Sequence, residues 1–257
     1  MTEHTANSPQ ASLTDPSWLA TSLGQYIINN EFDYFDQLVA NIFGYNAIQL
    51  GLPHYDFLRA NRMPLRFSAG YEPMVALRAR VDHLPISSES IDLVIMPHVL
   101  EFNTNPHQIL REVYRILIPE GHIVISGFNP FSLWGLHRHF TSSRDEFPWN
   151  GNFIALSRLK DWLKLLNFEM KGGKLCCYAP PLSKENWRKR FKFMEDAGDR
   201  WWPISGGVYF LHAVKHKHCM HLIKPSWKTS LAGKRKIVAA TQRSKDNSDR
   251  NRMNLPQ

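Results

Sequence analysis

The hydrophobic positions of this chain follow two alternating patterns. Short, nearly continuous apolar runs recur along it, and the clearest is IDLVIM at 91–96. Between them lie longer segments in which apolar residues return every three or four positions, as on one face of a helix. The expected strands are 47–50, 63–68, 75–80, 91–96, 123–126 and 208–214, and the expected helices are 16–43, 107–118 and 156–167. This alternation predicts an α/β fold, with a mostly parallel sheet and helices on both faces.

The same pattern divides the chain into three parts. We expect 1–44 to be a disordered start followed by a helical extension, which Gly44 ends and which packs on the body. Residues 45–216 hold the strand and helix alternation and are expected to form one domain. Residues 217–257 have low hydrophobicity and are expected to lack fixed structure.

Charge is distributed unevenly between these parts. The net charge is +8, but the segment from Lys215 to the end holds 11 Lys and Arg residues and only two acids, so the body is close to neutral. Such a tail can contact the phosphates of a nucleic acid, or it can be a solvated extension, and both readings stay open. The aromatic and basic segment Trp187–Met194 also has two interpretations. It can be a half-buried helix, or it can contact RNA.

Composition bears on the cellular compartment of the protein and on whether it binds a metal. No apolar run approaches a bilayer span, and the polar N-terminus does not resemble a signal peptide, so we expect a cytoplasmic protein with no membrane contact. The cysteines lack metal or disulfide spacing, which fits a reducing compartment. A histidine-rich run shows no sign of converging on a metal, and we expect none there. Its residues are His212, His216, His218, Cys219 and His221.

The stretch 84–126 carries a succession of short motifs. Leu84-Pro85 precedes a polar turn, 91–94 opens a strand, and His98-Val99-Leu100-Glu101 follows that strand. Asn105-Pro106 then begins a helix, and Leu117-Ile118-Pro119-Glu120-Gly121 leads into the next strand. In order and spacing this stretch resembles the class I S-adenosylmethionine-dependent methyltransferases of type 11. With flanking strands the resemblance covers about 47–214, and it looks like an uncharacterised bacterial branch of that family.

The resemblance implies a Rossmann-like fold with S-adenosylmethionine bound outside the carboxyl ends of the strands. Carried onto this sequence, it places Gly51, Asp82, His83, Leu84 and His98 at the cofactor. For His98, a backbone contact to the cofactor and a helix cap both remain open. Asp92, at the start of its strand, is instead expected to be structural and to accept from backbone amides.

The chain departs from the family pattern in its first half. The loop after the first strand has Gln49 where the family has an acid, and one glycine, Gly51, where the family has three. The second strand ends without an acid, and Glu72 is the nearest one. Arg80 stands where the family has an Asp near the adenine. Gly51 could therefore belong to a cofactor loop or to a plain turn.

Candidate catalytic residues follow the later strands. Glu101 and Asn129 are the first substrate-side residues that we would test. Asn129-Pro130-Phe131 is similar to a motif of amino-methylating enzymes, but it follows the fifth strand and not the fourth, and a loop-to-helix turn explains it as well. The sequence thus predicts a methyltransferase of unknown substrate. One alternative is an inactive protein of the same fold that serves as a binding or scaffold protein. Another is an RNA-associated protein that contacts RNA through its basic tail, with or without methyl transfer.

Overall fold

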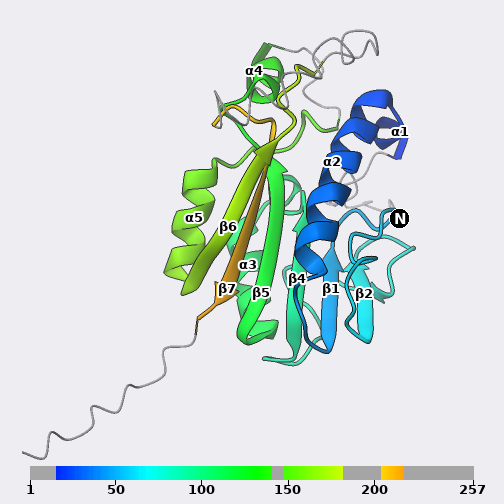
Figure 1. Cartoon of the computed structure of the whole chain (residues 1–257), viewed down its shortest axis with the longest axis vertical. Helices are drawn as coiled ribbons and strands as arrows, with labels where there is room; N and C mark the ends of the chain where they lie inside the picture. The colour runs from blue at the N-terminus through cyan, green and yellow to red at the C-terminus, as the bar shows by residue number, and fades with distance from the viewer. Residues whose placement is uncertain (1–15, 141–146, 182–203, 217–257) are drawn as a thin grey trace, which may run out of the picture. The chain divides into compact units, whose positions relative to one another are not determined.

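The computed structural model describes residues 16–140, 147–181 and 204–216 (Figure 1). The predicted disordered start (1–15), the segment Trp187–Met194 and the tail 217–257 lie outside them. The helices described are α1 (Pro16–Leu19), α2 (Ser22–Val39), α3 (Pro106–Ile116), α4 (Leu133–Phe140) and α5 (Leu156–Leu165), with a 3₁₀ turn η1 (Leu100–Phe102). The strands are β1 (Asn46–Leu50), β2 (Leu65–Gly70), β3 (Leu77–Arg78), β4 (Ile91–Pro97), β5 (Leu117–Phe128), β6 (Phe168–Cys176) and β7 (Val208–Lys215). Among these residues no helix is long and apolar enough to cross a bilayer.

One seven-stranded sheet organises the fold, in the order β3-β2-β1-β4-β5-β7-β6. Strands β1 to β5 pair in parallel, and β7 runs antiparallel to both β5 and β6. The mostly parallel α/β prediction is therefore confirmed, and each predicted strand overlaps an observed one. Because β1, β2 and β4 are parallel neighbours, their carboxyl ends meet at one edge of the sheet.

Strand β6 was not predicted, and its position explains why. It lies at the edge of the sheet and pairs with β7 alone. The centre of the strand, Lys171 to Lys174, is exposed, and Gly172 and Gly173 lie within it. Glycines and lysines carry no apolar pattern, so the pairing with β7 makes this strand and its own propensity does not.

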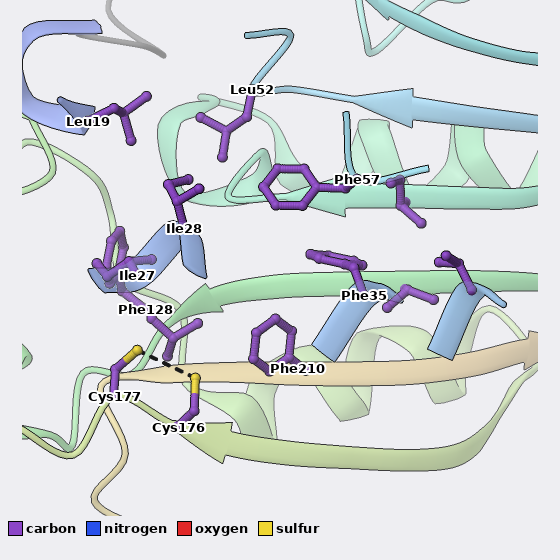
Figure 2. Packing of buried hydrophobic residues seen from close by; sticks show 14 of the residues in the cluster. Leu19, Ile27, Ile28, Phe35, Leu52, Phe57, Phe128, Cys176, Cys177 and Phe210 are labelled. Carbon is purple, nitrogen blue, oxygen red and sulfur yellow. Dashed lines mark hydrogen bonds between the residues drawn. The ribbon is translucent and has the colours of Figure 1, made fainter. Parts of the chain in front are cut away.

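Helices cover both faces of the sheet (Figure 1). One buried cluster joins α2 to one face, with Ala47 and Leu93 from the strands, and Figure 2 shows its Ile28, Phe35 and Phe210. The other cluster joins α3 and α5 to the opposite face, and its strand residues include Ile48. Residues of the central strands β1, β4, β5 and β7 thus enter both layers, as expected for strands buried on both sides.

Helix α2 is fixed at both ends. Thr21 caps its start by accepting a hydrogen bond from the Gly24 amide at 3.1 Å. Its last turn ends at Val39, short of the predicted 43, because the Asn61 side chain donates to the carbonyls of Val39 and Ile42 at 2.7 and 3.1 Å. The Val39 carbonyl also accepts from the Ile42 amide at 3.2 Å, so a backbone turn and a side chain from the next layer together satisfy the end of the helix.

The turn between α3 and β5 is tighter than predicted. Helix α3 ends at Ile116 and β5 begins at once with Leu117, which pairs with Ile91. The register is irregular between Ile91 and Leu93, and Glu120 lies there with a φ of 62°. Pro119-Glu120-Gly121 therefore does not precede the strand, as the sequence suggested, but forms an irregularity within β5.

Asp92 joins the start of β4 to the start of β1. Its Oδ2 accepts from the amides of Tyr45 and Asn46 at 3.1 and 2.9 Å, as the sequence predicted. Gly44 precedes them, and a Cβ at Gly44 would lie 2.5 Å from the Asp92 Cβ. The prediction that Gly44 ends the helix was wrong, because α2 already ends at Val39; the glycine instead leaves room for the carboxylate.

We predict that Asp92→Ala lowers the free energy of unfolding by roughly 1–3 kcal/mol, because two amides lose a charged acceptor. Urea titration measures this. Asp161→Ala, an exposed acid on α5, is the matched control and should change stability by less than about 0.5 kcal/mol. Equal effects of the two substitutions would contradict the role given to Asp92.

Candidate functional site

A cavity opens where the carboxyl ends of β1, β2 and β4 meet. It encloses about 510 Å³ of space between atoms, including solvent at its mouth. Its lining residues come from the segments that follow these strands. They are Gly51, Leu52, Pro53, Ala69, Gly70, Tyr71, Glu72, Val75, Val81, Pro97, His98 and Val99. The cavity thus lies at the edge where parallel α/β sheets bind ligands.

The segment after β1 forms one wall and has an unusual backbone. Gly51 has a φ of 84°, and Leu52 follows with a φ of 43°. A Cβ on Gly51 would lie 2.6 Å from Cγ2 of Val99 and 3.0 Å from the Pro97 carbonyl oxygen. Both the conformation and the close approach of the segment after β4 therefore require glycine here.

The Gln49 side chain holds this segment in place. It is buried, and its Nε2 lies 3.1, 3.1 and 2.7 Å from the carbonyl oxygens of Gly51, Leu52 and Tyr55. Its Oε1 accepts from the Phe57 amide at 3.0 Å. An acid at this position could not donate to carbonyl oxygens, so glutamine suits this loop as an acid would not.

Leu52 lines the cavity, but its side chain does not extend into solvent. It is buried with the α2 cluster, and Figure 2 shows its side chain directed toward Ile28. The strained backbone at Leu52 is therefore compensated by burial of its side chain in the core.

The segment after β2 brings an acid to the cavity. Tyr71 and Glu72 follow the last strand residue, Gly70, and line the cavity. Oε2 of Glu72 lies 3.8 Å from Nδ1 of His54. We predicted no ligand role for Glu72, because it is two residues beyond the strand and the sequence does not show how the loop turns.

His98 lies at the floor of the cavity with two buried carboxylates behind it. Its Nδ1 lies 2.8 Å from Oε2 of Glu101, and its Nε2 lies 3.0 Å from Oε1 of Glu31. All three residues are at most 4% exposed. Burial by itself would lower the pKa of His98, but the carboxylates of Glu31 and Glu101 outweigh it and raise that pKa to about 10. His98 is therefore an imidazolium at neutral pH.

The comparisons with known proteins agree with this geometry. A family model described as a methyltransferase domain matches residues 57–125, which begin just after the Gln49 loop. A solved structure from Thermotoga maritima has a TM-score of 0.58 at 16% identity and covers 78% of this chain and 93% of its own. It is described as an S-adenosylmethionine-dependent methyltransferase, possible histamine N-methyltransferase.

The chain has the class I methyltransferase fold. A second structure of this fold, with a TM-score of 0.59 at 16% identity, is the Haloferax volcanii complex of the Trm112 methyltransferase activator with its proposed methyltransferase. It covers 83% of this chain and 100% of that one. The uncharacterised protein YafS of Escherichia coli is 44% identical over 125 residues, 49% of this chain. The chain spans about half the length of the curated relatives that it matches.

Within this methyltransferase fold, the predicted cofactor residues divide into two groups. Gly51 and His98 line the cavity. Asp82, His83 and Leu84 are not among its lining residues, whereas the preceding Val81 is.

The segment after Val81 is held by its own contacts. Arg80 binds both Asp82 oxygens, at 2.9 and 2.7 Å, and its hydrogen bond lowers the pKa of Asp82 to about 2. The His83 side chain is exposed, and its Nδ1 lies 3.4 Å from Asp82. The Leu84 side chain is buried, and its amide donates to Glu112 at 2.7 Å.

The two candidate catalytic residues are buried and hydrogen-bonded within the protein. Glu101 accepts from the Phe128 amide in addition to its contact with His98. Nδ2 of Asn129 donates to the carbonyls of Ile204 and Gly206 at 2.8 and 3.0 Å. Neither residue lines the cavity. Glu101 links the segment after β4 to the end of β5, and Asn129 links the segment after β5 to the residues that lead into β7.

The histidine-rich run does not converge in the part that the structure describes. His212 lies 2.9 Å from His122 on the neighbouring strand, and His216 lies 3.4 Å from Glu120. Residues 218, 219 and 221 lie outside the described ranges. Within those ranges, no group of three or more His, Cys, Asp or Glu residues is placed to hold a metal ion.

We predict that Gly51→Ala destabilises the protein by roughly 1–3 kcal/mol, because its left-handed backbone and its contact with Val99 leave no room for a methyl group. Gly172→Ala is the matched control, since nothing lies within 4 Å of its missing Cβ. Urea unfolding of both variants measures the difference. A Gly51→Ala protein as stable as the control would contradict the tight contact between the two loops.

The raised pKa of His98 predicts a dependence of stability on pH. Its folded pKa lies above the unfolded value of 6.5, so its contribution is complete below pH 6.5 and is lost as pH rises through about 10. We expect the free energy of unfolding of the parent to fall over this range more steeply than that of His98→Asn, which tolerates positive φ and does not titrate. Parallel curves for the two proteins would contradict the charged state of His98.

Proposed function

We propose that this protein is an S-adenosylmethionine-dependent methyltransferase that binds its cofactor in the cavity between β1, β2 and β4. The observation that carries the proposal is the cavity itself, at the carboxyl ends of three parallel strands and bordered by Gly51 and His98. The match of residues 57–125 to a methyltransferase domain supports the same assignment.

The residues present fit the chemical parts of this cofactor. Ala69, Val75, Val81 and Val99 provide apolar walls suited to a purine ring. The Glu72 carboxylate can accept hydrogen bonds from two ribose hydroxyls, although the strand itself ends without an acid. When bound, the cofactor would supply an electrophilic methyl group on a sulfonium.

The chain's own contribution would be binding and orientation. The apolar walls exclude water, and the Gln49 network keeps the loop at Gly51 in one conformation before the ligand arrives. No general base is needed where the acceptor is already a good nucleophile, because positioning alone accounts for much of the rate. Contact with nucleic acid through 217–257 and a cytoplasmic location stay predictions.

The alternative is a protein of the same fold without methyl transfer, serving as a scaffold. Binding of the cofactor separates the two functions. A shared fold at 16% identity does not imply a shared activity, so binding of the cofactor has to be measured directly.

We predict that S-adenosylmethionine binds the purified parent with a dissociation constant on the order of 10 μM, measured by calorimetry. Val75→Trp should weaken binding at least about tenfold, because Val75 is half-buried at the cavity and the larger ring fills it. Leu165→Trp is the control, since Leu165 is 82% exposed on α5. An absence of binding heat at about 1 mM cofactor would reject the proposed function.

A further inference from the structure

Glu31 is an acid on the buried face of α2. Ile27 precedes it by one turn and Phe35 follows it by one turn, and both belong to the apolar cluster on that face. The residue is 0% exposed. A buried carboxylate is costly unless it is paired, so its partners indicate why the helix carries it.

The partners of Glu31 lie at the carboxyl ends of β4 and β5. Its Oε1 is 3.0 Å from Nε2 of His98 and accepts a hydrogen bond of 2.6 Å from Oγ of Ser126. The carbonyl of the same serine accepts from the His98 amide at 3.1 Å. These three contacts form a closed ring, in which Glu31 holds the side chain of His98 and also the residue that binds its backbone.

The backbone that this ring holds is strained and lines the cavity. His98 has a φ of 52°, which a residue with a side chain adopts only when its surroundings impose it. Its neighbours Pro97 and Val99 line the cavity and face Gly51 from the other side. A shift at 97–99 would therefore change the width of the cavity.

Charged and titratable groups reach this site from several elements. Glu31 comes from α2 and Glu101 from η1, and both carboxylates contact His98. Burial raises the pKa of Tyr209 on β7, and the Glu101 carboxylate adds to this. Burial and then the neighbouring Cys176 raise the pKa of Cys177, with a smaller contribution from Glu31. Glu101 is three residues from His98 along the chain, so Glu31 is the carboxylate that links the cluster to the α2 layer.

We propose that Glu31 is a positioning residue of the crevice, which fixes the 97–99 backbone through its ion pair with His98 and its hydrogen bond from Ser126. The helical extension is then part of the binding site. This inference rests on the proposed function in one respect, which is that the ligand of the crevice is S-adenosylmethionine.

Glu31→Gln tests the charge while keeping the shape of the side chain. We expect cofactor affinity to fall about tenfold by calorimetry, because an ionic contact is lost. We also expect amide hydrogen exchange at His98 and Val99 to rise about tenfold or more, and the NMR titration of the His98 ring to move to lower pH. Hydrogen exchange and the NMR titration report the position and the charge of His98. A general loss of stability would not alter these two properties selectively.

Lys215→Met is the matched control. Lys215 is also buried and charged, but its Nζ donates to the carbonyls of Tyr114 and Leu117 at the opposite edge of the sheet. This variant should melt at a lower temperature than the parent yet keep cofactor affinity within about twofold. An equal loss of affinity in Lys215→Met would overturn the specific role of Glu31.

The outcomes separate this inference from the proposed function. If the parent binds no cofactor, the proposed function fails, and exchange and titration at His98 in Glu31→Gln still decide the role of Glu31. Unchanged exchange and an unchanged His98 titration would overturn the inference, even in a protein that binds cofactor. If Glu31→Gln does not fold, Ser126→Ala removes one of the three contacts and should raise exchange at His98 about threefold, and unchanged exchange there would overturn the inference.

Discussion

The crevice depends on the hydrogen bonds of the Gln49 side-chain amide. A chain that leaves a parallel strand must turn away from the sheet, and here it does so through two residues with positive φ. The buried side chain of Gln49 donates hydrogen bonds to the carbonyl oxygens of these two residues. It also accepts a hydrogen bond from the Phe57 amide. The loop is thus closed on its own strand before any ligand is present, and this geometry brings Gly51 against Val99.

This contact gives a physical reason for the departure from the family pattern. A loop with three glycines and an acid would lie close to a ligand and would draw its hydrogen bonds from it. The loop in this protein instead satisfies its carbonyls internally and buries Leu52 under α2. It keeps glycine at the one point where a second loop approaches too closely for a side chain. The second wall, at His98, is held from behind by Glu31 of α2, so both walls depend on the layer that the N-terminal helix forms.

The sequence predicted the parts of the fold that local patterns determine. Continuous apolar runs identified β1, β4 and β7, and the position of Asp92 at the start of a strand indicated a structural role, because an acid there is far from the crevice. Strand β6 was missed because its pairing comes from β7 and its own residues are polar. The resemblance to methyltransferases implied five cofactor residues. Gly51 and His98, which directly follow strands, line the crevice, and Asp82, His83 and Leu84 do not. Val81 and Glu72 were not expected there, because their positions depend on how a loop turns. Glu31 was not expected either, because its contact with His98 joins residues 67 positions apart in the chain. Glu31 did leave one signal, which is an acid on the apolar face of a helix.

The most direct test of this account is a crystal structure of the protein grown with S-adenosylhomocysteine, the product form of the proposed cofactor. The account predicts the nucleoside between Gly51, Glu72 and His98, with the hydrogen bonds of Gln49 and the ion pair of Glu31 unchanged. A nucleoside bound elsewhere, or a Gln49 side chain released so that the loop can open around the ligand, would contradict the claim that the crevice is already formed.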